Sequence, residues 1–217
     1  MRRSWLTGWI LPLTLSIGNA AHAAVVMVTT PAALHATDQI NWASLGASGT
    51  IVPGSFTINT QNGTPISVDT GGDQPNFKRL DQGNGFIGDF LPGTPLPATN
   101  SLGSTHLHFA TPVFGAGAYI QHTTYPSFTA YLRADAGSTI LAEYTLLDSN
   151  DQLGNGTASF IGILSDQRNI TDVYFDSFYG LNTVTAGPLL TTPEPATLLL
   201  ASVIPALLFR QRSKRLP

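Results

Sequence analysis

Hydrophobic and polar residues alternate along several short segments in the second half of the chain. In 128–133, the apolar side chains of Phe128, Ala130 and Leu132 fall on one face of an extended strand. The same kind of pattern continues in 140–146, 160–164 and 173–175. Alternation at period two, interrupted by turns about every ten residues, predicts antiparallel sheets with one buried face.

Further strand candidates lie earlier in the chain, around one stretch rich in turn residues. The candidates are 51–59, 65–68, 105–110 and 117–121. Between Asp69 and Asn100, repeated glycines and three closely spaced prolines predict a long loop. A total of roughly eight to ten strands predicts an all-β fold, an antiparallel β-sandwich of jelly-roll type. We expect this domain to span 24–188.

The N-terminal end has the three parts of a secretory signal peptide. Two arginines follow Met1, an uncharged and mostly apolar stretch covers 5–17, and Ala21 and Ala23 supply the small-x-small pattern. We therefore expect signal peptidase to cleave before Ala24 and to remove the first 23 residues.

The C-terminal segment 189–217 combines a proline motif, an apolar run and a basic end. The run covers 196–209, and at about 1.5 Å per residue it reaches roughly 21 Å, against a hydrocarbon core of roughly 30 Å. We expect a short transmembrane helix with its basic end on the cytoplasmic side. The motif is Pro193-Glu194-Pro195, and the basic end contains Arg210, Arg212, Lys214 and Arg215.

These three parts, in this order, resemble the PEP-CTERM sorting signal of Gram-negative bacteria. The resemblance covers 191–217 and implies processing by an exosortase, a membrane-embedded protease. It also implies export through the inner membrane, transient retention there by the tail, and a final place at the cell surface or in the extracellular matrix. Members of this family are commonly linked to exopolysaccharide and biofilm.

The body carries a second resemblance, in its glycine-rich strand segments. The segments 81–90, 108–113 followed by 115–120, and 160–163 before 170–175 are similar to a β-sandwich body that is common among exported PEP-CTERM proteins. The resemblance implies a fold like that of a carbohydrate-binding module, with no established reaction.

Charge and cysteine content restrict the partners of the body. Residues 24–192 hold four basic and twelve acidic residues, a net charge of −8, while the whole chain carries −3. Binding to nucleic acid or to anionic lipid needs clustered lysine and arginine, so neither is an expected partner of the body. The chain has no cysteine, which excludes disulfides and thiolate metal sites.

Two groups of residues raise the question of metal binding. His106 and His108 share a face of an expected strand, and with His122 or Glu143 they would form a metal site. The carboxylate that a cupin-like pattern needs shortly after the second histidine is missing, so we interpret both histidines as polar residues on a solvent face.

Calcium is the one cofactor that stays an open alternative. The residues around Asp148 resemble part of a calcium loop, but Leu153 and Ser159 stand where an EF-hand needs glycine and glutamate. Calcium bound by loop oxygens leaves no fixed spacing in the sequence. The acidic residues available for it are Asp69, Asp73, Asp81 and Asp89.

No pattern for nucleophilic catalysis is present, because the serines lack a G-x-S-x-G elbow. Paired carboxylates for glycoside hydrolysis stay open, since such pairs meet only in three dimensions. Asp172 and Asp176 flank Val173 and Phe175, which places both carboxylates on the outer face of a strand. Aromatic residues expected at the surface, where they could stack on sugars, are Trp42, Tyr125, Tyr131, Tyr174 and Tyr179.

The sequence thus predicts an exported structural or carbohydrate-binding protein, and not an enzyme. Its expected partners are signal peptidase, an exosortase, an exopolysaccharide and, transiently, the inner membrane. Two alternatives stay open: an extracellular hydrolase that acts on polysaccharide, and a calcium-stabilised carbohydrate-binding module.

Overall fold

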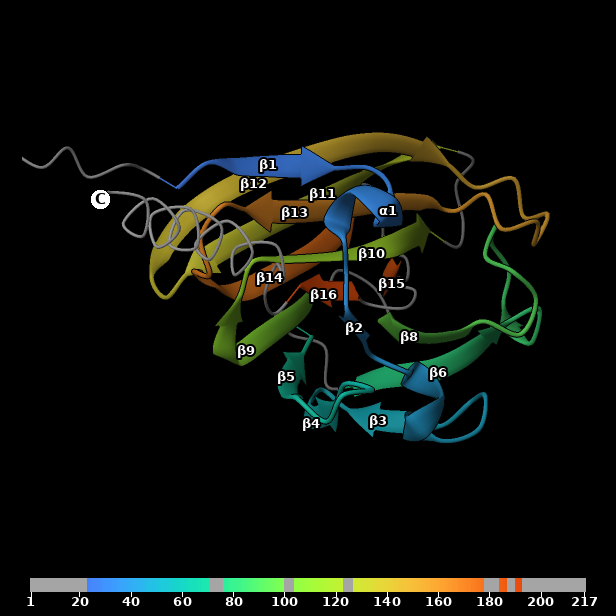
Figure 1. Cartoon of the computed structure of the whole chain (residues 1–217). Helices are drawn as coiled ribbons and strands as arrows, with labels where there is room; N and C mark the ends of the chain where they lie inside the picture. Colours follow the sequence, from blue (N-terminus) through green and yellow to red (C-terminus); the bar gives the residue numbers. More distant parts are fainter. Residues whose placement is uncertain are drawn as a thin grey trace, which may run out of the picture.

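The computed structural model describes residues 23–70, 76–99, 104–122, 127–177, 184–186 and 190–192. Within these ranges the chain consists mostly of short strands, which form two sheets (Figure 1). All strand pairings among the described residues are antiparallel except one short parallel pair, β6 (Asn76–Gln82) with β7 (Gly85–Phe86). The prediction of a β protein with antiparallel sheets is therefore confirmed.

The smaller sheet has six strands in the order β12-β11-β14-β9-β5-β4. Apolar and polar residues alternate along β11, where Phe128, Ala130 and Leu132 are buried and Tyr131 and Arg133 are half-buried on the opposite face. The predicted alternation is thus confirmed in this strand. The six strands are β4 (Ser55–Asn59), β5 (Pro65–Asp69), β9 (Thr105–Val113), β11 (Ser127–Ala136), β12 (Thr139–Ser149) and β14 (Ile170–Ser177).

The larger sheet has ten strands within the described ranges, with a main path β1-β13-β10-β15-β8-β6-β3. Three short strands pair beside this path: β16 with β10, β2 with β16, and β7 with β6. The ten strands are β1 (Val25–Val28), β2 (Asp38–Gln39), β3 (Ile51–Pro53), β6 (Asn76–Gln82), β7 (Gly85–Phe86), β8 (Pro95–Thr99), β10 (Gly115–His122), β13 (Ser159–Ser165), β15 (Val184–Ala186) and β16 (Leu190–Thr192).

One hydrophobic cluster contains residues of both sheets. Leu107 and Phe175 enter it from the six-stranded sheet, and Phe77, Ile120 and Ile161 enter it from the ten-stranded sheet. These side chains are almost completely buried. Because a chain without cysteine has no disulfides, burial of this apolar surface is a main source of its stability.

The structure differs from the sequence prediction in two segments. The segment 51–59, predicted as one strand, is divided at Gly54 into β3 and β4, which belong to different sheets. The predicted loop between Asp69 and Asn100 contains β6, β7 and β8. The strand period of β6 is hidden because two of its buried residues, Arg79 and Gln82, are polar. In β8 the prolines, which usually weaken a strand assignment, lie inside the strand.

The long loop between β12 and β13 is held by a buried carboxylate. Asp89 is only 2% exposed, and its two oxygens accept the backbone N–H groups of Asp151 (2.7 Å) and Leu153 (2.9 Å). The loop turns at two glycines with positive φ, Gly154 and Gly156.

The described helices are short: α1 (Pro31–Leu34) and a 3₁₀ turn, Trp42–Leu45. No helix in the described part of the chain is long and apolar enough to cross a membrane. The expected transmembrane helix 196–209 lies outside the described residues. Strand β16 belongs to the segment that the sequence assigns to the tail, and it ends directly before Pro193.

Candidate functional site

The outer face of the six-stranded sheet carries a row of polar side chains that crosses all six strands. Each residue of the row is in register with the next one on the neighbouring strand. We call this set the polar row; in spatial order it consists of Ser55, Asp69, His106, Tyr174, Arg133 and Glu143. The row exists because residues two apart on a strand share a face, and the other face of the sheet is occupied by the core.

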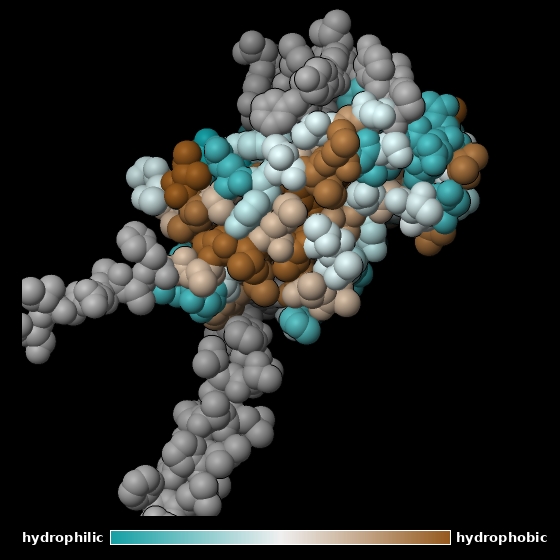
Figure 2. Space-filling view, turned by 90° about the horizontal axis from the view of Figure 1, so that it is seen from above, coloured by the Kyte–Doolittle hydropathy of each residue, from teal (hydrophilic) through white to brown (hydrophobic). Residues whose placement is uncertain are grey.

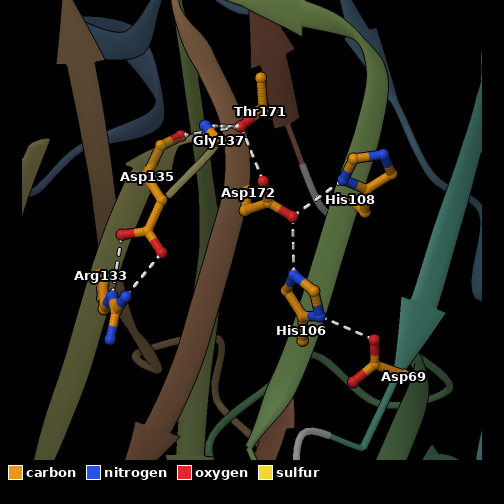
Figure 3. A network of polar contacts seen from close by, with 8 residues as sticks. All are labelled: Asp69, His106, His108, Arg133, Asp135, Gly137, Thr171 and Asp172. Carbon is orange, nitrogen blue, oxygen red and sulfur yellow. Dashed lines mark hydrogen bonds and ion pairs between the residues drawn. The ribbon is translucent and has the colours of Figure 1, made fainter. Parts of the chain in front are cut away.

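A second register row lies beside the first, and hydrogen bonds join the two. Asp172 is the central acceptor: its Oδ1 lies 2.9 Å from His106 Nε2 and 2.9 Å from His108 Nδ1. Its Oδ2 accepts the hydroxyl of Thr171 at 2.7 Å. On the other side of the ring, His106 Nδ1 lies 2.7 Å from Asp69 Oδ2. Figure 3 shows Asp172 between the two histidines, with Asp69 beyond His106.

Both ring nitrogens of His106 therefore face a carboxylate. A neutral imidazole has one N–H and can donate to only one of them, whereas an imidazolium donates to both. The geometry of the Asp69–His106–Asp172 bridge is thus complete when His106 carries a proton on each nitrogen. In that state the ring links three neighbouring strands, β5, β9 and β14, through side chains alone.

The pKa of Asp172 reflects two opposing effects. Burial raises the pKa of this carboxyl, but the hydrogen bonds from Thr171, His108 and His106 outweigh burial and lower the pKa below its ordinary value of 3.8. Asp172 is therefore a carboxylate at neutral pH.

Tyr174 lies in the middle of the polar row and is covered on both faces. The ring of His106 stacks on it with the centroids 4.2 Å apart and the planes 3° apart. The guanidinium carbon of Arg133 lies 5.2 Å from the centroid of the Tyr174 ring. Arg133 is itself fixed by two 2.8 Å hydrogen bonds to the carboxylate of Asp135. Tyr174 thus presents its edge and not its face to solvent.

A further contact extends the polar surface toward β12. The hydroxyl of Tyr131 donates to Glu143 Oε1 at 2.6 Å. Burial, and then the hydrogen bond to Glu143, raises the pKa of Tyr131 to about 12. Charged side chains on this face are mainly acidic: Asp69, Asp135, Glu143, Asp172 and Asp176 stand beside Arg133 and the two histidines.

The structure does not bring the metal-site candidates together. His122 is buried on β10 of the other sheet, and Glu143 lies three strands away from His106. Across the described ranges, no group of three or more histidine and acidic residues is arranged to hold a metal ion.

The acids considered for calcium are also separated. Asp69 contacts His106, Asp81 forms a 2.7 Å ion pair with Arg79, and Asp89 accepts backbone N–H groups. Asp73 lies outside the described residues. Each described carboxylate of this set therefore has a partner of its own.

Sequence reasoning recognised some members of the site but not their connection. His106, His108, Asp172 and Tyr174 were expected on an outer face, and they lie there. Arg133 and Thr171 were not expected, since their roles depend on the register of β11 with β14. The prediction for Trp42 was wrong: it is buried, with only 1% of its surface exposed.

The predicted sorting and cleavage residues mostly lie outside the described ranges. Those outside are Ala21, Tyr125, Tyr179, Pro193, Glu194, Pro195, Arg210, Arg212, Lys214 and Arg215. Ala23 and Ala24 are described, and the backbone nitrogen of Ala24 donates to Asp166 Oδ1 at 3.0 Å. No protein-family model matches this chain, and no curated protein matches it.

Proposed function

We propose that this is an exported protein of the cell surface or extracellular matrix, and that it binds a polysaccharide through the polar row. The observation that carries the proposal is the row itself. Hydrogen-bonding side chains from six strands form one continuous surface, and most are already held by a neighbour. Such preorganisation lowers the entropic cost of binding, because fewer side chains must be ordered when the ligand arrives.

The chemistry of this surface favours sugar hydroxyl or amino groups as its ligands. Carboxylate oxygens accept hydrogen bonds from both, and the exposed nitrogen edge of His108 adds a polar contact. An acidic polysaccharide fits poorly, because it would meet the carboxylates of Asp69, Glu143 and Asp176. Since both faces of Tyr174 are covered, recognition proceeds through hydrogen bonds and not through stacking on that ring.

We propose binding without catalysis for a geometric reason. A glycoside hydrolase needs two carboxyl groups that face each other across the scissile bond. Here the imidazole of His106 fills the space between Asp69 and Asp172 and bonds to both. Hydrolysis by this pair would require the ring to leave first.

We further propose that the two sheets form a β-sandwich of jelly-roll type. The shared hydrophobic cluster and the alternation of buried and polar residues on β9, β11 and β14 support this architecture. A polar sheet face above such a core is a rigid platform for a ligand.

The sorting part of the proposal rests on the two ends of the chain. We propose that signal peptidase releases Ala24, that the tail holds the protein transiently in the inner membrane, and that an exosortase then processes the Pro193–Pro195 region. One contact supports the first site: the Ala24 nitrogen lies 3.0 Å from the Asp166 carboxylate.

Mass spectrometry of the protein exported by a Gram-negative host that has an exosortase tests the sorting proposal. The expected masses begin at Ala24 and end within or near the Pro193–Pro195 region. A surface form that still contains Arg210–Arg215 contradicts it.

Incubation of the exported protein with the polysaccharide of the producing organism tests the binding proposal. Depletion of the protein from solution together with the insoluble polysaccharide supports binding. Released oligosaccharide supports the hydrolase instead. If neither depletion nor release is observed, a purely structural role remains. If depletion occurs and is abolished by EDTA and restored by calcium, the calcium-stabilised module replaces the metal-free one.

A further inference from the structure

Among the described residues, the six-stranded sheet ends in a long strand that has a partner on one side only. β12 contains 11 residues, and within the described part of the chain no strand pairs with its outer edge. The other edge strands are much shorter: β4 has 5 residues, β1 has 4 and β3 has 3. An open edge presents unpaired backbone N–H and C=O groups, which are a template for pairing with another strand.

β12 also lacks the residues that usually protect such an edge. Lysine, proline and bulges are the common devices, and β3 has Pro53. β12 contains no lysine, arginine or proline, and its charged residues are Glu143 and Asp148. Its pairing with β11 is irregular only near Ala134 and Asp135, opposite residues 140–142. The stretch from Ala142 to Ser149 is therefore a regular strand, and no described strand pairs with its outer side.

Exposed apolar side chains occur on β12 and on the neighbouring β1. Leu147 is 77% exposed and Ile140 is 50% exposed on β12, and Val26 on the neighbouring β1 is 50% exposed. β1 and β12 adjoin, since the Tyr144 hydroxyl donates to the Val25 carbonyl at 2.9 Å. Figure 2 views the molecule from the side where β1 and β12 lie uppermost in Figure 1, and it shows several hydrophobic residues among paler and hydrophilic ones on this surface.

We propose that β12 is a dimerisation edge, and that its partner is β12 of a second copy of this chain, paired antiparallel about a twofold axis. A twofold axis at Thr145 keeps each face of the sheet continuous, because it pairs residues whose numbers add to 290. Thr145 then faces its own copy, Tyr144 faces Leu146, and Glu143 faces Leu147. Threonine pairs are favourable across antiparallel strands.

The register brings no like charges face to face at the edge itself. In this register Asp148 faces Ala142, so no carboxylate lies opposite another carboxylate. An anionic bilayer is disfavoured, because neither β12 nor β1 carries a basic residue. A twofold pair is also closed: each copy covers the other's edge, and neither β12 remains open. This inference does not depend on the polysaccharide proposal.

Sedimentation velocity of the exported protein over a range of concentrations tests the proposal. The wild type is expected to show a reversible equilibrium between one and two chains. Thr145→Lys places two cations opposite each other in the dimer and leaves the monomer unchanged, so the dissociation constant should rise at least about tenfold. Thr145→Val, which keeps a β-branched side chain, should dimerise like the wild type.

Thr57→Lys is the matched control, because Thr57 is an exposed residue on the outer face of β4, at the opposite edge of the same sheet. It should leave the equilibrium unchanged. Hydrogen exchange should slow at alternate amides of 142–148 as the concentration rises. A wild type that stays monomeric at every concentration overturns the proposal, as does a dimer that Thr145→Lys and Thr57→Lys weaken equally. The proposal would also be overturned if an added extended peptide protected the amides of 142–148 from exchange while the chain alone stayed monomeric.

Discussion

Replacement of Asp172 tests how the polar surface is held together. In Asp172→Asn, the amide nitrogen can donate to Thr171 Oγ1, and the remaining oxygen still faces His106 and His108. The variant therefore keeps the shape of the site and loses its charge. Hydrogen bonds to a charged group contribute about 1.5–3 kcal/mol and neutral ones about 1 kcal/mol. We expect the variant to lower the free energy of unfolding by about 1–2 kcal/mol at neutral pH.

The dependence of this loss on pH follows from the lowered pKa of Asp172. The stabilisation by the carboxylate is complete above pH 3.8, the ordinary pKa of an aspartate. It is lost as the pH falls through the lower pKa that Asp172 has in the folded protein. The difference between the wild type and Asp172→Asn should therefore shrink toward zero in strong acid. Other acids titrate equally in both proteins and cancel in the difference.

Urea unfolding at neutral pH and in strong acid measures both effects. Asp151→Asn removes an exposed carboxylate from the loop between β12 and β13 and serves as the control. It should change the free energy of unfolding by less than about 0.5 kcal/mol. Asp172→Ala should cost more than Asp172→Asn, since it leaves Thr171 and both histidines without their shared acceptor. If the difference between Asp172→Asn and the wild type is the same at both pH values, the assigned role of the carboxylate is wrong.

Three further predictions concern other described residues. Asp89→Ala should lower the free energy of unfolding by about 2–3 kcal/mol and speed proteolysis in the loop around Asp151, because two backbone N–H groups lose a buried acceptor; unchanged cleavage would refute this. Gly117→Ala should cost about 1–3 kcal/mol in a thermal melt, because the new methyl group would lie 2.9 Å from the Cα of Gly162 and closer still to Phe160; an unchanged melting temperature would contradict it. In an ultraviolet pH titration, one tyrosine should ionise only at about 12, and Tyr131→Phe should remove that transition.

The sequence predicts much of the six-stranded sheet because its strands have one buried face and one solvent-exposed face. Phe128, Ala130 and Leu132 alternate with polar residues, and this alternation can be recognised without knowing how the side chains pack. Strands of the ten-stranded sheet are harder to predict. β6 buries Arg79 and Gln82, which read as surface residues, and β8 contains two prolines. Burial of such residues depends on tertiary contacts that no local pattern contains.

The polar row could be predicted only in pieces. The spacing of His106 and His108, and of Asp172 and Tyr174, indicates a shared face on each strand. Their contact across strands depends on register, which places Tyr174 opposite His106 and Arg133 opposite Tyr174. A shift of one residue would turn these side chains into the core. Register is set by the whole sheet, so the Asp69–His106–Asp172 bridge could not be predicted from the sequence.

The central claim, that the polar row binds a polysaccharide, is tested most directly by the affinity of the exported protein for the polysaccharide of the producing organism. The variant Asp69→Asn/His108→Ala changes two partly exposed side chains on the polar face, and Gln61→Ala on the distant β4–β5 turn is the control. Isothermal titration calorimetry should show affinity reduced about tenfold or more in the double variant and unchanged in the control. Equal affinities of the wild type and the double variant, or no binding by the wild type, would contradict the claim.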